Sequence, residues 1–143
     1  MAEGGVQVIR ILLVEDDYAI ARANERLIRR NVTAALEVVH VVTAEGAIAA
    51  IAFASEPFTL VVCDWNLGGV LNGGDVLTAV MKLPRPPGFL FLSSDERCGE
   101  RGVEWLQKPC RPSELREAVL AFIEQPKTVK EMPLDGAFDL GGL

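Results

Sequence analysis

The feature that most strongly constrains the fold of this chain is a set of short apolar runs, most of which end in a short polar motif. The chain contains five short runs that we expect to form strands, at 8–14, 36–42, 58–63, 89–92 and 103–107. Four of them are followed by a short polar motif: Glu15-Asp16-Asp17, Asp64-Trp65-Asn66, Ser93-Ser94 and Lys108-Pro109. A strand that is covered on both faces shows as a nearly continuous apolar run. The runs therefore predict strands, the first of them covered on both faces, with polar side chains at the carboxyl ends of four.

The segments between these runs carry helix signals. Asp17 stands at an N-cap position before apolar residues at helical spacing, and Thr43 does the same for a helix over 44–54. A Gly-rich loop leads into a helix over 75–83, and Pro112 opens a last helix that reaches Glu124. The alternation predicts an α/β fold, a doubly wound parallel sheet with helices on both faces. Ligands bind such sheets beyond the carboxyl ends of the strands, where the polar motifs lie.

The segment 95–102 (DERCGERG) breaks this alternation. It has no apolar stripe and contains two glycines. Each glycine costs about 1 kcal/mol in a helix interior. We therefore expect a single turn or an irregular loop here in place of a fourth helix, so that this helix is shortened or missing.

Composition limits the class of protein. The formal net charge is −6, and a nucleic-acid-binding chain needs a basic surface, so we expect no nucleic-acid partner. No apolar run approaches the roughly 20 residues that span a bilayer, and residues 1–7 lack secretory-signal features, so we expect no membrane partner. The three cysteines have no CxxC spacing; they are typical of reduced thiols in a cytoplasmic protein.

We expect one domain over 8–125, with an N-terminal extension (1–7) and a C-terminal tail or linker (126–143). Three further residues stand in or beside the runs. Cys63 is expected to be a small core residue. Trp65 is expected to be a partly exposed lid beside the site, and His40 an ordinary strand residue.

The residues of the polar motifs predict phosphoryl-transfer chemistry. An aspartate at a strand end, here Asp64, can attack phosphorus and carry the group as an aspartyl phosphate. Because both partners are anionic, the attack needs a cation, and Glu15 and Asp16 offer the oxygen ligands that Mg²⁺ or Mn²⁺ prefers. Lys108 offers a positive charge to a phosphoryl oxygen and can pair with Asp64, while Ser93 offers a hydroxyl. The Lys108-Pro109 bond is a candidate cis peptide.

The four polar motifs, taken in this order over about residues 8–125, resemble those of response-regulator receiver domains. The resemblance implies a flavodoxin-like sheet of strand order 2-1-3-4-5. It implies that Asp16 binds the metal directly and Glu15 mainly through water, and that Asp64 and the backbone carbonyl of Asn66 complete the protein ligands. Receivers normally have a longer segment between the hydroxyl residue and the lysine, so the segment at 95–102 is a departure.

The resemblance also assigns regulatory roles. Ser93 would move on phosphorylation and Trp105 would rotate inward, as the switch pair. Asn66 and Asp95, each two residues after a site residue, would tune dephosphorylation. A sensor histidine kinase or a phosphotransfer protein would phosphorylate Asp64, and output would pass through a partner protein or a domain outside this chain. Apart from self-phosphorylation from small donors and self-dephosphorylation, no enzyme activity is expected.

Two alternatives stay open. The chain can be a scaffold or interaction module on the same fold, which the short segment at 95–102 favours. It can also be a metal-dependent phosphatase with an aspartyl nucleophile. Such enzymes usually carry a second aspartate two residues after the nucleophile, where this chain has Asn66.

Overall fold

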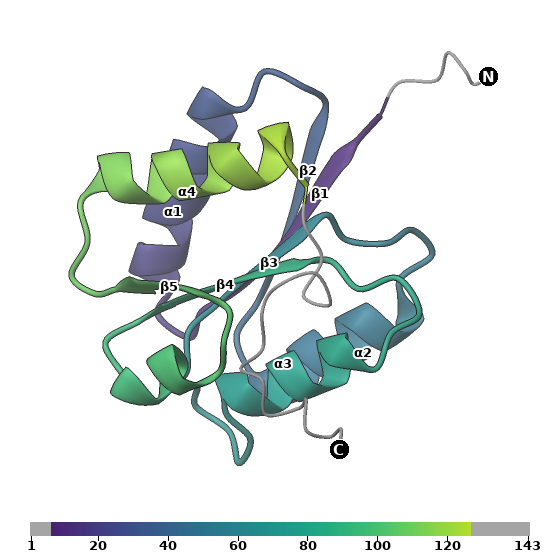
Figure 1. The fold of residues 1–143 in the computed structure, drawn as a ribbon, viewed down its shortest axis with the longest axis vertical. Helices are drawn as coiled ribbons and strands as arrows, with labels where there is room; N and C mark the ends of the chain where they lie inside the picture. The colour runs from purple at the N-terminus through teal and green to yellow at the C-terminus, as the bar shows by residue number, and fades with distance from the viewer. Residues whose placement is uncertain (1–6, 127–143) are drawn as a thin grey trace, which may run out of the picture.

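The computed structural model of the chain describes residues 7–126, and its centre is a five-stranded parallel sheet (Figure 1). The strand order is β2-β1-β3-β4-β5, and every neighbouring pair is parallel. This confirms the predicted fold class and order. The strands are β1 (Ile9–Val14), β2 (Leu36–Val41), β3 (Leu60–Cys63), β4 (Gly88–Ser93) and β5 (Glu104–Gln107).

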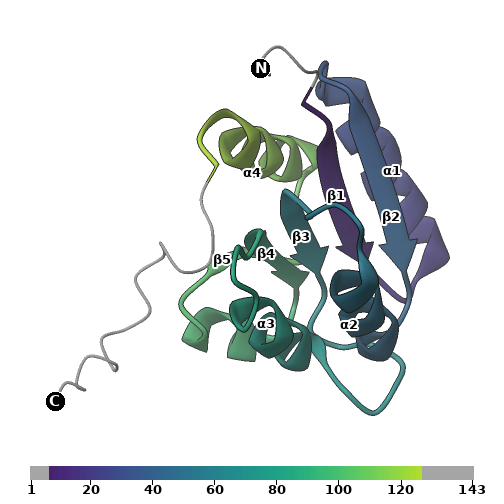
Figure 2. The same ribbon diagram turned by 90° about the vertical axis from the view of Figure 1, so that its right-hand side faces the viewer.

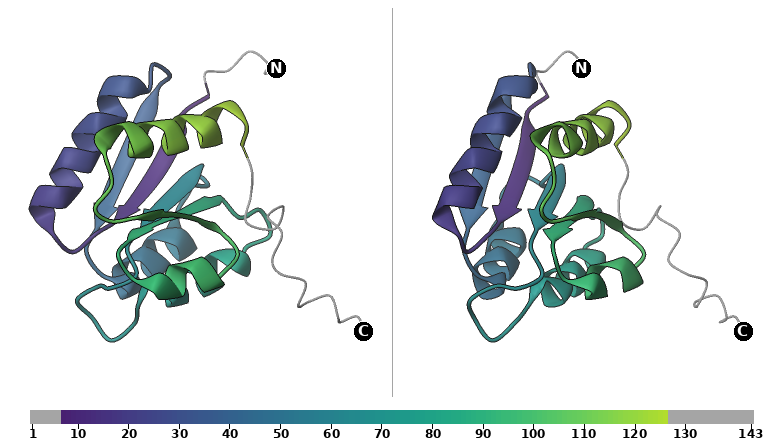
Figure 3. Two further views of the ribbon diagram at one scale, coloured as in Figure 1. Left: turned by 60° about the vertical axis from the view of Figure 1, so that its left-hand side comes forward. Right: turned by 90° about the vertical axis from the view of Figure 1, so that its left-hand side faces the viewer.

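Helices cover both faces of the sheet. α1 and α4 lie on one face, and α2 and α3 lie on the other (Figures 2 and 3). The helical elements are α1 (Tyr18–Asn31), α2 (Ala44–Phe53), α3 (Gly73–Met81), the 3₁₀ helix η1 (Glu96–Glu100) and α4 (Pro112–Glu124). Of the predicted N-terminal extension (1–7) and C-terminal tail (126–143), residues 1–6 and 127–143 lie outside the described residues. No helix among residues 7–126 combines the length and the apolar character that a membrane crossing requires.

The strands divide their side chains between two cores, one on each face. Leu12 of β1 packs with the residues under α2 and α3, whereas Leu13 packs with those under α1 and α4. Every residue of β3 and β4 is buried. Because alternate strand residues face opposite sides, a strand with helices on both sides has no exposed position. This explains why the sequences of these two strands are almost entirely apolar, and Cys63 is a core residue as expected.

Side chains fix where the helices begin. The predicted caps are confirmed, since Asp17 accepts from the N–H groups of Ala19 and Ile20, and Thr43 accepts from that of Gly46. These bonds satisfy N–H groups that have no partner within the helix.

The predicted third helix is confirmed, but it lies two residues earlier than the expected range of about 75–83. It begins at Gly73, because Asn72 and Asp75 form a capping box in which each side chain accepts from the other's backbone N–H. It ends at Met81.

One turn of 3₁₀ helix replaces a fourth α-helix between β4 and β5, as the sequence predicted. Its N-cap is Asp95, which accepts from the Arg97 N–H. Cys98 is buried under this turn. The ring of Trp105 lies against the turn at Gly99, where an added Cβ would be 3.0 Å from Trp105 Cζ3. The turn therefore closes one side of the carboxyl end of the sheet with few residues.

Candidate functional site

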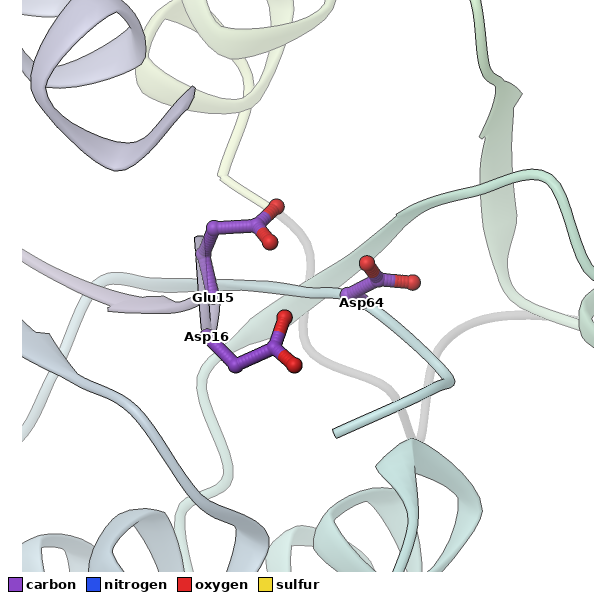
Figure 4. Close-up of side chains that lie close together, drawn as sticks. All are labelled: Glu15, Asp16 and Asp64. Carbon is purple, nitrogen blue, oxygen red and sulfur yellow. The ribbon is translucent and has the colours of Figure 1, made fainter. Parts of the chain in front are cut away.

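Three carboxylates meet at the carboxyl end of the sheet. Oxygen atoms of Glu15, Asp16 and Asp64 all lie within 4.8 Å of one another. Figure 4 shows Glu15 and Asp16 extending from the end of β1 on the side where Asp64 follows β3. The strand register causes this meeting. Val14 pairs with Cys63, and the Asp64 N–H donates to the Val14 oxygen at 3.1 Å, so the residues after both strands are neighbours.

Lys108 bridges two of these carboxylates. Its Nζ lies 2.8 Å from Glu15 Oε1 and 3.1 Å from Asp64 Oδ2, so the predicted pairing with Asp64 is confirmed. The Lys108 N–H donates to the Ser93 oxygen at 3.0 Å, which holds the end of β5 beside β4. The Lys108-Pro109 peptide is cis, as predicted. Burial alone would lower the pKa of the Lys108 amine, but its bond to Glu15 and the nearby negative charges raise it. Lys108 therefore stays charged at the site.

Glu15 is the most deeply buried member of the cluster. It is only 3% exposed, and burial raises the pKa of its carboxyl group. The bonds from Lys108 and from the Asp17 N–H act in the opposite direction. Asp16, by contrast, is exposed. A buried carboxylate with one amine neighbour gains from a second cation, so the arrangement fits a divalent metal. The three carboxylates are also hard oxygen donors of the kind that Mg²⁺ and Mn²⁺ take.

Ser93 is the last residue of β4 and is fully buried. Its Oγ accepts from the Asp95 N–H at 3.2 Å, and its backbone oxygen accepts from Trp105 Nε1 at 2.9 Å. The two residues predicted to form the switch are therefore in direct contact. Their movement on phosphorylation stays a prediction.

Asn66 and Asp95 also meet across the site. The Asn66 N–H donates to Asp64 Oδ1 at 3.3 Å, and its side-chain amide donates to Asp95 Oδ2 at 3.2 Å. Arg97 forms an ion pair with Asp95 at 2.7 Å. Sequence reasoning missed Arg97, because nothing local in DERCGERG distinguishes it from other charged residues.

The prediction that Trp65 is a partly exposed lid is wrong. Its side chain is buried, with only 5% exposed, and its ring lies 5.4 Å from that of Phe91. The guanidinium groups of Arg97 and Arg101 lie 5.2 and 5.8 Å from its ring. An added Cβ at Gly74 would be 2.7 Å from Trp65 Cη2, so this glycine gives the indole its space. The ring thus lies in the core beside Gly74 of α3 and Arg97 of η1.

His40 is a strand residue, as expected, but it also makes a contact that the sequence did not indicate. It lies in β2, but its Nε2 is 2.8 Å from the backbone oxygen of Glu15. Since a carbonyl can only accept, the Nε2–H donates. The ring edge also contacts Tyr18, with centroids 5.6 Å apart. His40 therefore helps to fix the backbone that carries Glu15. No local signal marks this role, which depends on β2 pairing with β1.

A groove of about 370 Å³ opens beside Lys108, on the side of α1. Its lining is mostly apolar or small, and the amide nitrogen of Asn24 within it has no hydrogen-bond partner among the described residues. The groove is lined by Ile20, Asn24, Leu92, Ser94, Lys108, Pro109 and Cys110. A partner that approaches here would reach the Lys108 side of the site.

Comparison with solved structures defines what the fold resembles. The signal receiver domain of a LuxO repressor protein from Vibrio parahaemolyticus is 23% identical, with a TM-score of 0.71, over 83% of this chain and 92% of its own. The phosphorylated cyanobacterial phytochrome response regulator RcpA is 25% identical, with a TM-score of 0.68, over 85% of this chain and 98% of its own. The chain has the receiver-domain fold.

Other receiver domains agree. The receiver of the hybrid histidine kinase CckA is 28% identical, with a TM-score of 0.62, over 78% of this chain and 96% of its own. No family model matches the chain, and no curated protein matches its sequence. The structural neighbours therefore confirm the receiver-domain resemblance, and the acidic cluster lies where the resemblance implies.

Proposed function

We propose that this chain is a phosphorylation-dependent signalling switch in which Asp64 accepts a phosphoryl group from a histidine. One observation carries the proposal: Asp64 lies in a cluster with Glu15 and Asp16 and is paired with Lys108 at 3.1 Å. The cluster joins a nucleophile, metal ligands and a fixed positive charge in one place. The receiver-domain fold and the phosphorylated state of the neighbour RcpA support it.

The reaction is a transfer from nitrogen to oxygen. An oxygen of Asp64 forms a bond to phosphorus while the bond between phosphorus and the donor imidazole nitrogen breaks, and the imidazole leaves as the neutral ring after taking a proton. Lys108 stabilises the charge on a phosphoryl oxygen. The Ser93 hydroxyl, held by the Asp95 N–H, donates to another phosphoryl oxygen when the strand end moves.

Glu15, Asp16 and Asp64 would hold Mg²⁺ or Mn²⁺, with the Asn66 carbonyl as the ligand that the resemblance adds. The metal would neutralise the charge that opposes the approach of one anion to another. Glu15 contributes mainly through water in this proposal, which agrees with its direct bond to Lys108.

The remaining parts of the proposal concern partners. The donor is a sensor histidine kinase or a phosphotransfer protein. The groove beside Lys108 supports an approach of its imidazole from the side of α1. The receiver of a hybrid kinase among the neighbours supports a phosphorelay. Output passes through a partner protein in the cytoplasm or through a domain outside this chain. The chain's own chemistry is limited to self-phosphorylation from small donors and self-dephosphorylation.

Tryptophan fluorescence with intact-protein mass spectrometry tests the proposal. Mg²⁺ is titrated first and acetyl phosphate is then added, with Asp64→Asn as the matched variant. Buried Trp65 follows Asp64 directly, so we expect a fluorescence change at each step. The mass of one phosphoryl group should appear in the wild type only. A wild-type chain that binds metal but gains no mass would contradict the proposal.

A scaffold function is the second candidate, and one observation favours it. The fourth helix is reduced to the single turn η1 at Glu96–Glu100, so the surface that this helix would form is small. The two functions differ in one measurable quantity, the affinity for a partner with and without acetyl phosphate. A scaffold binds equally in both conditions, whereas a switch does not.

A further inference from the structure

Arg97 and Asn66 together saturate the hydrogen-bonding capacity of the Asp95 carboxylate. The backbone N–H and the Nε of Arg97 both lie 2.9 Å from Asp95 Oδ1, and its Nη2 lies 2.7 Å from Oδ2. The Asn66 side-chain amide adds a fourth donor at 3.2 Å from Oδ2. Each carboxylate oxygen therefore already accepts two hydrogen bonds, which leaves no lone pair in the plane for a water molecule. These bonds hold the pKa of Asp95 well below its usual range.

Trp65 fixes Arg97 in this position. The guanidinium lies 5.2 Å from the Trp65 ring, within the range of a cation–π interaction. Trp65 is buried and its ring packs on Phe91, so it offers Arg97 a fixed surface beside the site. Arg101 lies 5.8 Å from the same ring, but it donates to Thr78 Oγ1 and not to Asp95. The two arginines share a contact with the ring and differ in what they bind.

We propose that Arg97 is a positioning residue that prolongs the life of the phosphoryl group on Asp64 by keeping Asp95 from orienting the attacking water. This rests on the proposed function. In hydrolysis the water oxygen bonds to phosphorus, the bond from phosphorus to the Asp64 oxygen breaks, and inorganic phosphate and the free carboxylate result. The proton that the water loses passes to solvent. A released Asp95, linked to Asp64 through Asn66, accepts a hydrogen bond from that water and aligns it.

Lifetimes of the phosphorylated protein test the proposal. The full chain is labelled with acetyl phosphate and Mg²⁺, the donor is removed, and the loss of the phosphoryl mass is followed by mass spectrometry. We expect Arg97→Gln to shorten the lifetime about tenfold, equivalent to about 1.4 kcal/mol from one hydrogen bond to the attacking water. Arg97→Lys, which keeps the charge but loses the fork, should fall between the two.

Two further variants separate this role from a structural one. Arg101→Gln removes the other arginine over Trp65 and should leave the lifetime unchanged. The double variant Arg97→Gln/Asp95→Asn keeps the loss of Arg97 but removes the carboxylate that it would release, so the lifetime should return close to the wild-type value. A merely structural effect of Arg97 would not be reversed by a second substitution in the same turn.

The outcomes are distinct. An unchanged lifetime in Arg97→Gln overturns the proposal, as does an equal shortening in Arg101→Gln or a double variant that stays fast. Each of these results leaves the proposed function intact, because the wild type still gains the phosphoryl mass through Asp64. If the wild type gains no such mass while it binds Mg²⁺, the proposed function fails, and the role of Arg97 fails with it.

Discussion

The indole nitrogen of Trp105 donates a 2.9 Å hydrogen bond to the backbone oxygen of Ser93. This bond joins β5 to the buried end of β4. The same oxygen also accepts from the Lys108 N–H at 3.0 Å. The residue expected to rotate is thus attached to the residue expected to move, so a displacement of Ser93 reaches Trp105 without an intervening helix. This contact offers a physical route for coupling in a chain whose fourth helix is a single turn.

Replacing Trp105 by phenylalanine should weaken this connection. Trp105→Phe keeps an aromatic ring but removes the N–H donor. We expect the free energy of unfolding to fall by about 0.5–1.5 kcal/mol, the net contribution of a typical hydrogen bond. Urea denaturation measures this value. A free energy of unfolding that stays unchanged would show that the Lys108 N–H alone satisfies the Ser93 oxygen.

Gly73 should tolerate no side chain. A Cβ at this position would overlap the backbone oxygen of Asp64 and lie 2.9 Å from Trp65 Cα. Because these are backbone atoms, neither can rotate away. We expect Gly73→Ala to reduce the free energy of unfolding by about 1–3 kcal/mol, as overpacking does. We also expect weaker Mg²⁺ binding, because the added methyl group would displace the peptide that carries Asp64.

Gly68→Ala is the matched control in the same loop. Its Cβ would lie 3.9 Å from the nearest atom, Asp16 Oδ2, which is an ordinary contact. Urea denaturation and a Mg²⁺ titration should therefore give nearly wild-type values. Equal losses in the Gly68 and Gly73 variants would mean that the loop resists substitution for reasons other than the approach of Gly73 to Asp64.

Lys108 and a divalent metal should compete for the same carboxylates. Lys108 Nζ binds Glu15 Oε1 and Asp64 Oδ2, so Lys108→Met leaves a more negative cluster. We expect Mg²⁺ affinity to rise several-fold, because an amine charge a few ångströms from the metal no longer opposes binding. Phosphorylation by acetyl phosphate should slow in the same variant. Fluorescence titration measures the first effect and mass spectrometry the second.

Lys82→Met provides the charge-matched control for that experiment. Lys82 is an exposed residue that caps the carboxyl end of α3, away from the end of the helix that lies near Asp64. The Lys82→Met substitution changes the net charge of the chain by the same amount as Lys108→Met. If both variants raised Mg²⁺ affinity equally, the effect would come from net charge and not from competition at the cluster.

Much of the site could be predicted from the sequence because parallel strands bring their carboxyl ends to one edge. Asp64 and Glu15 follow buried strands and Lys108 follows the edge strand β5, so their meeting needs only the strand order. The single turn at η1 was predictable for a similar reason. Two glycines and the absence of an apolar stripe exclude a packed helix without reference to any distant residue.

The parts that escaped prediction depend on contacts between distant segments. Trp65 is buried because Gly74 makes room for its ring, and its sequence neighbours are polar or at the site. His40 reaches the Glu15 carbonyl across the pairing of β2 with β1. The start of α3 was misplaced because the reciprocal bonds of Asn72 and Asp75 override the glycines between them. In each case a tertiary contact, and not a local propensity, decides the outcome.

Cys63 should make stability depend on alkaline pH. Burial raises the pKa of its thiol well above the ordinary value of 9.0, so the unfolded chain loses this proton before the folded chain does. The stabilisation is complete below pH 9.0 and declines as the pH rises toward the folded-state pKa, by up to about 1.4 kcal/mol per pH unit. Cys63→Ala should flatten the fall in the free energy of unfolding between pH 9 and 10, measured in urea. Cys110→Ala, which removes a half-buried thiol, should flatten it less, and equal slopes in all three proteins would contradict this account.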